Sequence, residues 1–285
     1  MDKGIKVAGV VVLYNPSDDD IQNINSYIDD IDILYIMDNS DNDNEKRLPK
    51  NRKINYIYNG DNLGIATPLN KAAKLARKEK IDWLLTMDQD TNFNSGVIKE
   101  IKKRLLTIDY KKIGIVTPWH NTKLRVKKSN KKIDYPLDVM TSGNFLNLEI
   151  HKKIGGFKDW IFIDGVDMEY CLNLHKNNYQ IIRYNDLEIK HNLGEIKYRK
   201  FLWKELLITN HTAMRRYYQV RNYHYINDLY NGDFPDYCKK LIKLKAIIIG
   251  IIFFEKDKSN KLRACYRGYR DYRAGLRGKS YERYN

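Results

Sequence analysis

The chain has 285 residues, of which 42% are hydrophobic and 31% are charged, and its formal net charge is +15. A chain of this length and composition can bury a sizeable core, so we expect one large domain, or one domain with an appendage, and not a disordered protein. Its three cysteines, Cys171, Cys238 and Cys265, are odd in number and lack metal-type spacing, which argues against a disulfide framework or a zinc site and favours a reducing cytosol.

Apolar segments alternate with helical ones through the first half of the chain. We predict strands over residues 5–15, 33–40, 53–59 and 82–88, and a helix over residues 65–79. Strands that are apolar almost throughout and separated by helices are typical of a mainly parallel sheet covered on both faces. The predicted fold class is therefore α/β.

Each of these four strands ends in polar residues, which are Tyr14, Asn15, Asp38, Asn39, Ser40, Asn59, Asp61, Asn62, Asp88 and Asp90. Ligands of open parallel sheets bind beyond the carboxyl ends of the strands, so this pattern predicts a binding edge, although turns are also rich in such residues. The chain lacks both G-x-x-x-x-G-K-[ST] and G-x-G-x-x-G, which disfavours a P-loop kinase and a Rossmann dehydrogenase.

Asp88 and Asp90 form a D-x-D pair at the end of the fourth strand. Two carboxylates placed this way suit a divalent cation with oxygen ligands, either Mn²⁺ or Mg²⁺. A helix is predicted to follow at residues 94–106, however, so Asp90 or Asn94 would equally serve as its N-cap. The pair alone leaves both interpretations open.

The second half of the chain ends in a basic, aromatic segment. Residues 256–285 hold ten Lys or Arg against three Asp or Glu, a surplus of +7, and include Tyr281 and Tyr284. Such a segment fits an anionic lipid surface or a nucleic acid, and a solvated basic helix is the plainer alternative. The start of the chain does not read as a signal sequence, and the apolar run at 246–254 is shorter than the roughly 20 residues of a membrane span.

An ordered set of motifs gives the chain a resemblance to a known family. The motifs are VVVLYNP, IMDNSDN, NGDNLGIATPLN, WLLTMDQDT, SGNFLNLEIHKKIGGF, FIDGVDMEYCL and KHNLG. In this order they resemble the inverting nucleotide-sugar glycosyltransferases of family 2, and especially their bacterial rhamnosyltransferase branch, across residues 5–225. The resemblance implies a GT-A-type, mainly parallel sheet flanked by helices over residues 1–200, followed by a helical, basic and aromatic C-terminal extension over residues 201–285.

The same resemblance implies a metal site and a base. Asp88, Asp90 and a late histidine, His191, would hold the Mn²⁺ or Mg²⁺ that neutralises the departing diphosphate. Asp167 would deprotonate the acceptor hydroxyl, with Asp164 as the alternative base. Both acids would also be favoured at the start of a helix by its dipole.

The segment that follows these acids departs from the family in one place. If residues 164–169 are helical, Asp164 and Asp167 share a face while Glu169 points elsewhere. Where relatives usually carry Arg six residues after the base, this chain has Asn173. The role of that Arg in binding phosphate or shaping the loop is therefore in doubt here.

For the nucleotide-sugar donor, the resemblance implies contacts from the strand ends, from the NLG segment, from the SGN segment and from a helix predicted over 211–230. The residues are Leu13, Tyr14, Asn15, Asp38, Asn39, Asn62, Gly64, Asn70, Asp88, Gln89, Ser142, Gly143, Asn144, Arg215 and Arg216. Gly64 would let the backbone approach the donor closely. The two arginines would bind the diphosphate of the donor, or that of a lipid-linked acceptor, with forked hydrogen bonds, although the tyrosines of that helix equally fit packing against the sheet.

These implications define an expected function. We expect a metal-dependent, inverting transfer of a sugar, with dTDP-β-L-rhamnose favoured as donor, to a polyprenyl-diphosphate-linked bacterial polysaccharide intermediate. The enzyme would be cytoplasmic and peripheral at the inner face of the membrane, and UDP-sugar donors and a homodimer stay open. One alternative is a nucleic-acid-binding α/β protein that acts through its basic tail, although no nucleic-acid partner is expected. The other alternative is a non-catalytic scaffold.

Overall fold

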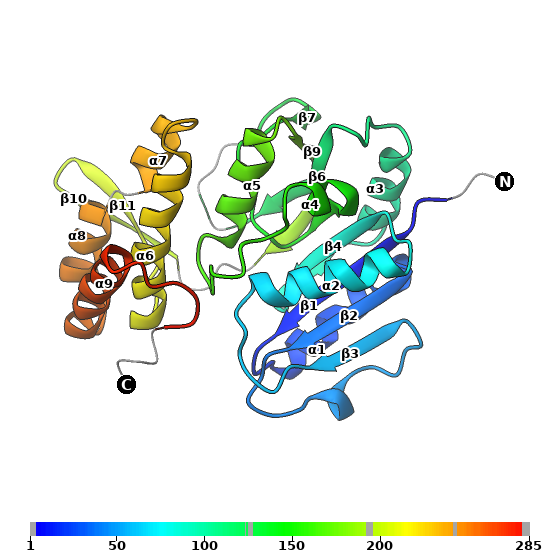
Figure 1. Ribbon diagram of the computed structural model, residues 1–285, viewed down its shortest axis with the longest axis horizontal. Coiled ribbons are helices and arrows are strands. Elements are labelled where there is room, and N and C mark those ends of the chain that lie inside the picture. The colour runs from blue at the N-terminus through cyan, green and yellow to red at the C-terminus, as the bar shows by residue number, and fades with distance from the viewer. Residues whose placement is uncertain (1–3, 123, 125–127, 192–195, 242–243, 281–285) are drawn as a thin grey trace.

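The computed structural model describes residues 4–122, 124, 128–191, 196–241 and 244–280, with His191, Lys204 and Leu244 described by their backbone alone. Figure 1 shows a central sheet with helices on both faces and a C-terminal group of helices beside it. Tyr281 and Tyr284 lie outside the described residues.

The main sheet has the order β3–β2–β1–β4–β8–β6–β9–β5, and β7 pairs with β9. Its strands are β1 (Val7–Leu13), β2 (Ile33–Asp38), β3 (Ile54–Tyr58), β4 (Trp83–Asp88), β5 (Thr91–Phe93), β6 (Ile113–Asn121), β7 (Ile133–Asp134), β8 (Asn144–Asn147) and β9 (Gln180–His191). The neighbours β3–β2, β2–β1, β1–β4 and β6–β9 run parallel. The α/β class and the four strands predicted in the first half are confirmed.

Helices pack on both faces of this sheet. They are α1 (Asp18–Asn23), α2 (Ala66–Lys78), α3 (Val97–Leu105), α4 (Leu148–Lys153) and α5 (Val166–Lys176), with short 3-10 turns η1 (Ile24–Ser26), η2 (Ile28–Asp30) and η3 (Glu45–Arg47). Alternate residues of β1 face opposite ways, because successive side chains of a strand point to opposite faces. Ala8 and Val10 pack in the core under α2 and α5, whereas Val7 and Val11 pack in the core with η1 and α3.

The strand register brings the polar strand ends together. Leu13 at the end of β1 lies beside Asp38 of β2, and Val12 lies beside Asp88 of β4. Asp38 in turn lies beside Tyr58 at the end of β3. Parallel pairing thus sets the carboxyl ends of four strands at one edge of the sheet, where ligands of such sheets bind.

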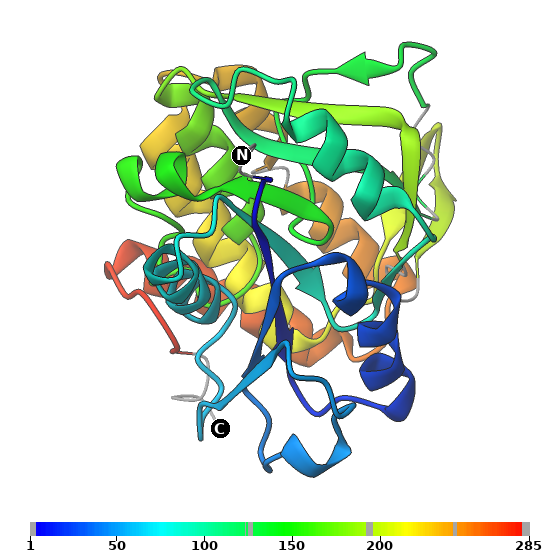
Figure 2. The ribbon, with the colours of Figure 1, turned by 90° about the vertical axis from the view of Figure 1, so that its right-hand side faces the viewer.

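The described residues of the C-terminal extension form a hairpin, β10 (Lys197–Phe201) and β11 (Lys204–Ile208), and the helices α6 (Ala213–Tyr230), α7 (Pro235–Leu241), α8 (Leu244–Phe254) and α9 (Lys258–Arg273). The extension lies at one end of the molecule in Figure 1 and behind the sheet in Figure 2. α6 connects the two parts, because its Ile226 packs against Gly165, directly before α5. Within the described part of the chain, no helix combines the length and apolar character that crossing a bilayer requires.

Candidate active site

Asp88 is the last residue of β4 and stands at the binding edge of the sheet. Its backbone N–H donates to Ser142 Oγ at 3.0 Å, and its side chain is partly accessible to solvent. Gln89 holds the loop that follows β1, because its Oε1 accepts a hydrogen bond from the Tyr14 N–H at 2.8 Å. The exposed Asp90 follows.

The alternative that the D-x-D pair only caps a helix is wrong. The strand β5 separates Asp90 from α3, which begins at Val97. The N-cap residue of α3 is Gly96, at φ +82°, and no side chain caps the helix. The two carboxylates therefore have no helix-capping role at this edge.

Asp88 has a strongly raised pKa. Burial is the main cause, the charge of Asp90 adds to it, Arg215 of α6 opposes both, and the net pKa is about 7. A pKa so far above the usual value of about 4 means that an ionised Asp88 is costly here without a cation. Such perturbed acids are typical of functional sites, and we call the region that holds Asp88, Asp90, Asp167 and Arg215 the cleft.

The oxygen donors of Asp88 and Asp90 fit a Mg²⁺ or Mn²⁺ ion that shares its ligands with a substrate diphosphate, since Mg²⁺ is commonly held by one or two carboxylates plus phosphates. No cluster of three or more His, Cys, Asp or Glu side chains suited to a metal occurs among the described residues. The side chain of His191 lies outside that description, but its backbone pairs with Thr91, next to Asp90. The fold thus brings the histidine to the end of the sheet that carries the pair.

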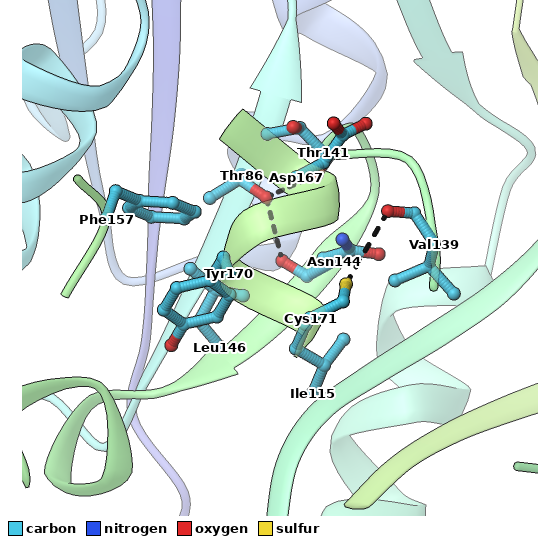
Figure 3. A pocket seen from close by; sticks show the side chains of 10 residues that line it. All are labelled: Thr86, Ile115, Val139, Thr141, Asn144, Leu146, Phe157, Asp167, Tyr170 and Cys171. Carbon is cyan, nitrogen blue, oxygen red and sulfur yellow. Dashed lines mark hydrogen bonds between the residues drawn. The ribbon is translucent and has the colours of Figure 1, made fainter. Parts of the chain in front are cut away.

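Asp167 faces the same part of the molecule from the first turn of α5. It lines a small cavity of about 10 Å³ (Figure 3), together with Thr86, Ile115, Val139, Thr141, Asn144, Leu146, Phe157, Tyr170 and Cys171. Its pKa is raised to about 6, mainly by burial; the hydrogen bond from the Met168 N–H lowers the pKa, and the charges of Asp138 and Asp88 raise it. Asp88 and Asp167 are therefore close enough to repel each other.

Asp164 does not lie on the helix with Asp167, so the expectation that they share a helical face is wrong. Asp164 has φ +59° and Gly165 has φ +98°, and α5 begins only at Val166. The Asp164 carboxylate accepts two hydrogen bonds from Arg215, at 2.6 and 3.2 Å. Asp164 therefore anchors the loop to α6, which leaves Asp167 as the carboxylate directed at the cavity.

The remaining polar residues of α5 are structural. Glu169 is fully buried, and its Oε1 accepts from the Tyr230 hydroxyl at 2.5 Å, which ties α5 to α6. Asn173 stands where relatives usually carry Arg, and its Nδ2 donates to the Ile154 carbonyl at 3.1 Å. Asn173 therefore points into the interior and away from the cleft.

The SGN segment turns into the sheet immediately before and at the start of β8. Gly143, at φ +80°, donates its N–H to the Thr86 carbonyl at 2.7 Å, and a Cβ at this position would clash with Ile189. Asn144 Nδ2 donates to the Met140 carbonyl, while its buried Oδ1 finds no hydrogen-bond partner among the described residues. That oxygen belongs to the cavity below Asp167, which has room for about one water molecule.

A larger hollow of about 290 Å³ lies between the strand ends and the C-terminal extension. Its lining comes from the loops after β1, β2 and β3, from the loop before α5, from α6 and from the segment after α9: Tyr14, Ser40, Asp41, Gly60, Asp61, Asn62, Phe162, Met214, Tyr218 and Lys279. Its size is close to the lower end of ligand pockets, about 300 Å³. Its size therefore suits a small-molecule ligand.

Of the predicted donor residues on the first two strands, Tyr14 reaches this hollow, whereas Leu13, Asp38 and Asn39 are buried. Burial alone would raise the pKa of Asp38, but hydrogen bonds from Ser40, Asn44 and Tyr56 outweigh it and hold the pKa below its usual value. Asn39 Nδ2 donates to the Gly64 carbonyl at 2.7 Å. These buried residues therefore stabilise the loops that line the hollow and do not themselves line it.

Other predicted donor residues support the rim. Asn15, at φ +46°, donates its N–H to Ser40 Oγ and its Nδ2 to Asp41, which links the first two loops. Asn62 lines the hollow, and its Oδ1 accepts from the Gly64 N–H at 3.0 Å. Asn70 lies on α2 and donates to the Phe157 carbonyl at 2.8 Å, so it holds the loop before α5.

Gly64 is required by close backbone contact. Its φ is +75°, and a Cβ here would lie 2.2 Å from the Phe162 carbonyl oxygen. The neighbouring Ile65 N–H donates to that same oxygen at 2.9 Å. Only glycine lets the NLG segment and the FIDG segment meet in this way.

The two predicted arginines of α6 point to different surroundings. Arg215 is half-buried, pairs with Asp164 and lowers the pKa of Asp88. Arg216 is buried in the extension against Glu255 and Gln219. The structure therefore brings Arg215 to the cleft and takes Arg216 away from it.

Sequence reasoning missed one side of the hollow. Lys279 donates to Asp61 Oδ1 at 2.6 Å although 218 residues separate them. The segment that carries it is held by Arg221, which donates to the Gly278 carbonyl at 2.8 Å and to Ser280 Oγ. Tyr218 belongs to the predicted arginine and tyrosine helix, but no motif marks Lys279.

Comparisons with known proteins agree with this geometry. A family model described as Glycosyl transferase family 2 matches residues 12–168. The dTDP-rhamnosyl transferase RfbF of Shigella flexneri is 26% identical over 236 residues, which cover 76% of this chain and 78% of that protein. A solved structure described as GalNAc-T7 with UDP, GalNAc and Mn²⁺ matches with a TM-score of 0.59 and 12% sequence identity, which shows a shared fold. The match covers 97% of this chain and 57% of the GalNAc-T7 chain. The chain therefore belongs to glycosyl transferase family 2 and is a glycosyltransferase of GT-A fold.

Proposed function

We propose that this enzyme is an inverting, metal-dependent rhamnosyltransferase that uses dTDP-β-L-rhamnose. The observation that carries the proposal is the electrostatic proximity of acids from two elements: the charge of Asp88, which ends β4 beside Asp90, raises the pKa of Asp167 on α5. The likeness to a dTDP-rhamnosyl transferase supports the choice of donor. A UDP-sugar is the alternative donor.

The nucleotide would occupy the hollow of about 290 Å³, with Tyr14 and Tyr218 beside its base and Lys279 at its rim. The diphosphate would then lie toward Asp88 and Arg215. A divalent ion held by Asp88, Asp90 and His191 would neutralise charge on the leaving diphosphate. Arg215 would add a fixed positive charge from the other side, because Asp164 holds its guanidinium in place.

Asp167 would act as general base on the acceptor hydroxyl. Its pKa of about 6 leaves it mostly ionised at neutral pH and still basic enough to accept a proton as the new glycosidic bond forms. The proton passes from the hydroxyl to the Asp167 carboxylate, while the bond between the anomeric carbon and the diphosphate oxygen breaks on the opposite face of the sugar. Attack from the face opposite the leaving group inverts the anomeric centre.

The acceptor we propose is a hydroxyl of a polyprenyl-diphosphate-linked saccharide of a bacterial surface polysaccharide. Such an acceptor stays in the membrane, so the enzyme would work at the inner face of the cell membrane. Residues 1–200 would carry out the chemistry. Residues 201–285 would close the nucleotide hollow through α6 and Lys279 and face the lipid.

Donor binding tests this proposal. We expect dTDP-rhamnose and dTDP to raise the Tm of the wild-type protein with Mn²⁺ present, because a ligand that binds only the folded state stabilises it by mass action. EDTA should remove most of that stabilisation. Asp88→Asn should lose the metal-dependent part, whereas the matched control Asp186→Asn, whose carboxylate pairs with Arg104 on the surface, should keep it.

Product analysis distinguishes the donors. Incubation with a lipid-linked acceptor and a panel of dTDP- and UDP-sugars should give the largest transfer from dTDP-rhamnose, with an inverted anomeric centre by NMR. Preference for a UDP-sugar would replace the donor and keep the mechanism. Retention of configuration, or full transfer in the presence of EDTA, would contradict the mechanism itself.

A further inference from the structure

The described part of the C-terminal extension exposes large apolar side chains where a protein surface normally hides them. Of the fifteen large apolar or aromatic residues that are exposed among the described residues, six belong to the β10–β11 hairpin and α8: Leu202, Trp203, Leu207, Ile248, Ile252 and Phe253. Trp203 is 84% exposed and Leu202 is 72% exposed. Exposed apolar groups gathered in this way mark interaction sites.

We call these six residues the apolar ridge, because packing joins the hairpin to α8. The Ile208 side chain lies over Gly250, where a Cβ would be 3.1 Å from it, and the rings of Phe201 and Phe253 lie 4.9 Å apart. Phe201 is followed directly by Leu202 and Trp203 at the hairpin tip. The tip therefore projects beside the exposed side of α8, which carries Ile248 and Ile252 one turn apart.

The hairpin tip is unusual for a protein surface that meets only water. Two-residue hairpin turns favour Asn-Gly or Asp-Gly, because their backbone needs positive φ. Here the two residues between the paired strands are Leu202 and Trp203, and Leu202 is at φ +55°. A leucine in the left-handed region costs stability, and the exposed side chains of Leu202 and Trp203 would be stabilised by burial against an apolar partner.

Basic side chains border the apolar ridge. Exposed basic residues are found on β10 and at both ends of α8: Lys197, Arg199, Lys200, Lys245, Lys256 and Lys258. Among the described residues of 196–208 and 244–258, Glu205 and Asp257 are the exposed acids. An apolar strip bordered by Lys and Arg is complementary to a bilayer surface with anionic headgroups, and tryptophan favours that interface.

We propose that the apolar ridge is the surface by which this enzyme docks on an anionic lipid bilayer, with Leu202 and Trp203 inserted among the headgroups. The helix α8 has 11 residues, about 16 Å at 1.5 Å per residue, so it lies along the interface and does not cross it. This inference rests on the proposed function, since it gives the enzyme its route to a lipid-linked acceptor.

Vesicle binding tests the proposal. Wild-type protein should sediment with vesicles that contain phosphatidylglycerol and at least tenfold less with phosphatidylcholine vesicles. Leu202→Ser with Trp203→Ser should lower binding to the anionic vesicles at least tenfold. The matched control is Leu106→Ser with Tyr110→Ser, a leucine and an aromatic residue that are 64% and 60% exposed on the catalytic part.

The charge requirement has its own pair of variants. Arg199→Glu with Lys200→Glu should weaken binding to anionic vesicles several-fold and reduce its dependence on salt, because fewer cations meet the surface. Lys111→Glu with Lys112→Glu, two exposed neighbours on the catalytic part, should leave binding unchanged. Equal loss in both pairs would overturn the proposal, since general charge and not the apolar ridge would then control binding.

Other outcomes separate this inference from the proposed function. Unchanged vesicle binding in the Leu202/Trp203 variant would overturn the proposal that the apolar ridge binds lipid. The proposal would also fail if analytical ultracentrifugation without vesicles showed a wild-type dimer that this variant alone abolishes, because the ridge would then be a dimer interface. Stabilisation by dTDP-rhamnose should be the same in the wild type and all four variants, because none lies in the cleft. If dTDP-rhamnose stabilised neither the wild type nor any variant, the proposed function would be contradicted, while the vesicle result would still stand.

Discussion

Charged side chains are gathered both in the partly accessible cleft and in the buried interior of the C-terminal extension, but the two regions balance them differently. In the extension, Glu255 receives Arg216 on one carboxylate oxygen and Lys261 on the other, the latter at 2.9 Å. In the cleft, Asp88 stands beside Asp90 and also repels Asp167. A buried carboxylate with partners serves the fold, whereas one with like-charged neighbours is suited to bind a cation or a proton.

The largest effect should come from the cleft. Asp88→Asn keeps the size of the side chain but removes the charge needed for the metal and the diphosphate, so we expect kcat/KM to fall by about 10³-fold or more, the scale seen when a major electrostatic contribution is lost. Steady-state transfer assays measure this. Asp186→Asn should stay within twofold of wild type, and comparable activity in both variants would remove the proposed role of the D-x-D pair.

The extension should respond in stability and not in chemistry. Glu255→Gln leaves Arg216 and Lys261 buried without their anion, which typically costs about 3–5 kcal/mol. Denaturant unfolding should therefore show a large loss of stability at unchanged m-value. A small effect would mean that the buried charges of the extension are not balanced as the structure indicates, and the contrast with the cleft would fail.

Removing the charge of Asp167 should stabilise the folded protein. Its pKa of about 6 exceeds the unfolded value of about 4, so the folded state binds more protons between these values and its stability falls as pH rises from about 4 to 6. Asp167→Asn removes this cost and should raise the Tm by about 3 °C at pH 8 without metal or donor. At pH 4 the two proteins should melt together; a lower Tm for the variant at pH 8 would contradict the burial of an uncompensated charge.

The smallest effect should come from the rim of the nucleotide hollow. Lys279 pairs with Asp61, and both side chains are near solvent. An ion pair of this kind is worth about 1 kcal/mol or less. Lys279→Ala should therefore raise the KM for the donor only a few-fold and leave kcat unchanged. Lys239→Ala, at another exposed ion pair in the extension, is the matched control. An equal KM in both variants would mean that the C-terminal segment does not contact the donor.

The sequence predicts well what depends on continuous patterns. Buried parallel strands are apolar almost throughout, so β1, β2 and β4 were readable from residues 5–88, and the partly exposed β3 was readable from its β-branched and aromatic residues. The helix over 65–79 was equally clear, because its alanines repeat at helical spacing, and α2 occupies Ala66–Lys78. Local patterns therefore located one wall of the cleft.

Tertiary contacts decide the rest. Asp164 takes φ +59° because α6 holds it, with Asn222 Nδ2 bonded to its carbonyl at 2.9 Å, and no local signal predicts that strain. Arg215 and Arg216 are chemically identical neighbours, and only the packing of α6 sends one to the cleft and the other to Glu255. Lys279 reaches Asp61 across 218 positions of the chain, a distance at which a single sequence carries no pairing information.

The most direct measurement of the central claim is the transfer rate of Asp167→Asn as a function of pH, with donor and Mn²⁺ saturating. If Asp167 deprotonates the acceptor, wild-type kcat should rise with pH through an apparent pKa near 6, and the variant should lose about 10³-fold at neutral pH and no longer show that rise. Donor binding should persist in the variant. A variant that transfers sugar at the wild-type rate, or that keeps the same pH profile, would contradict the account.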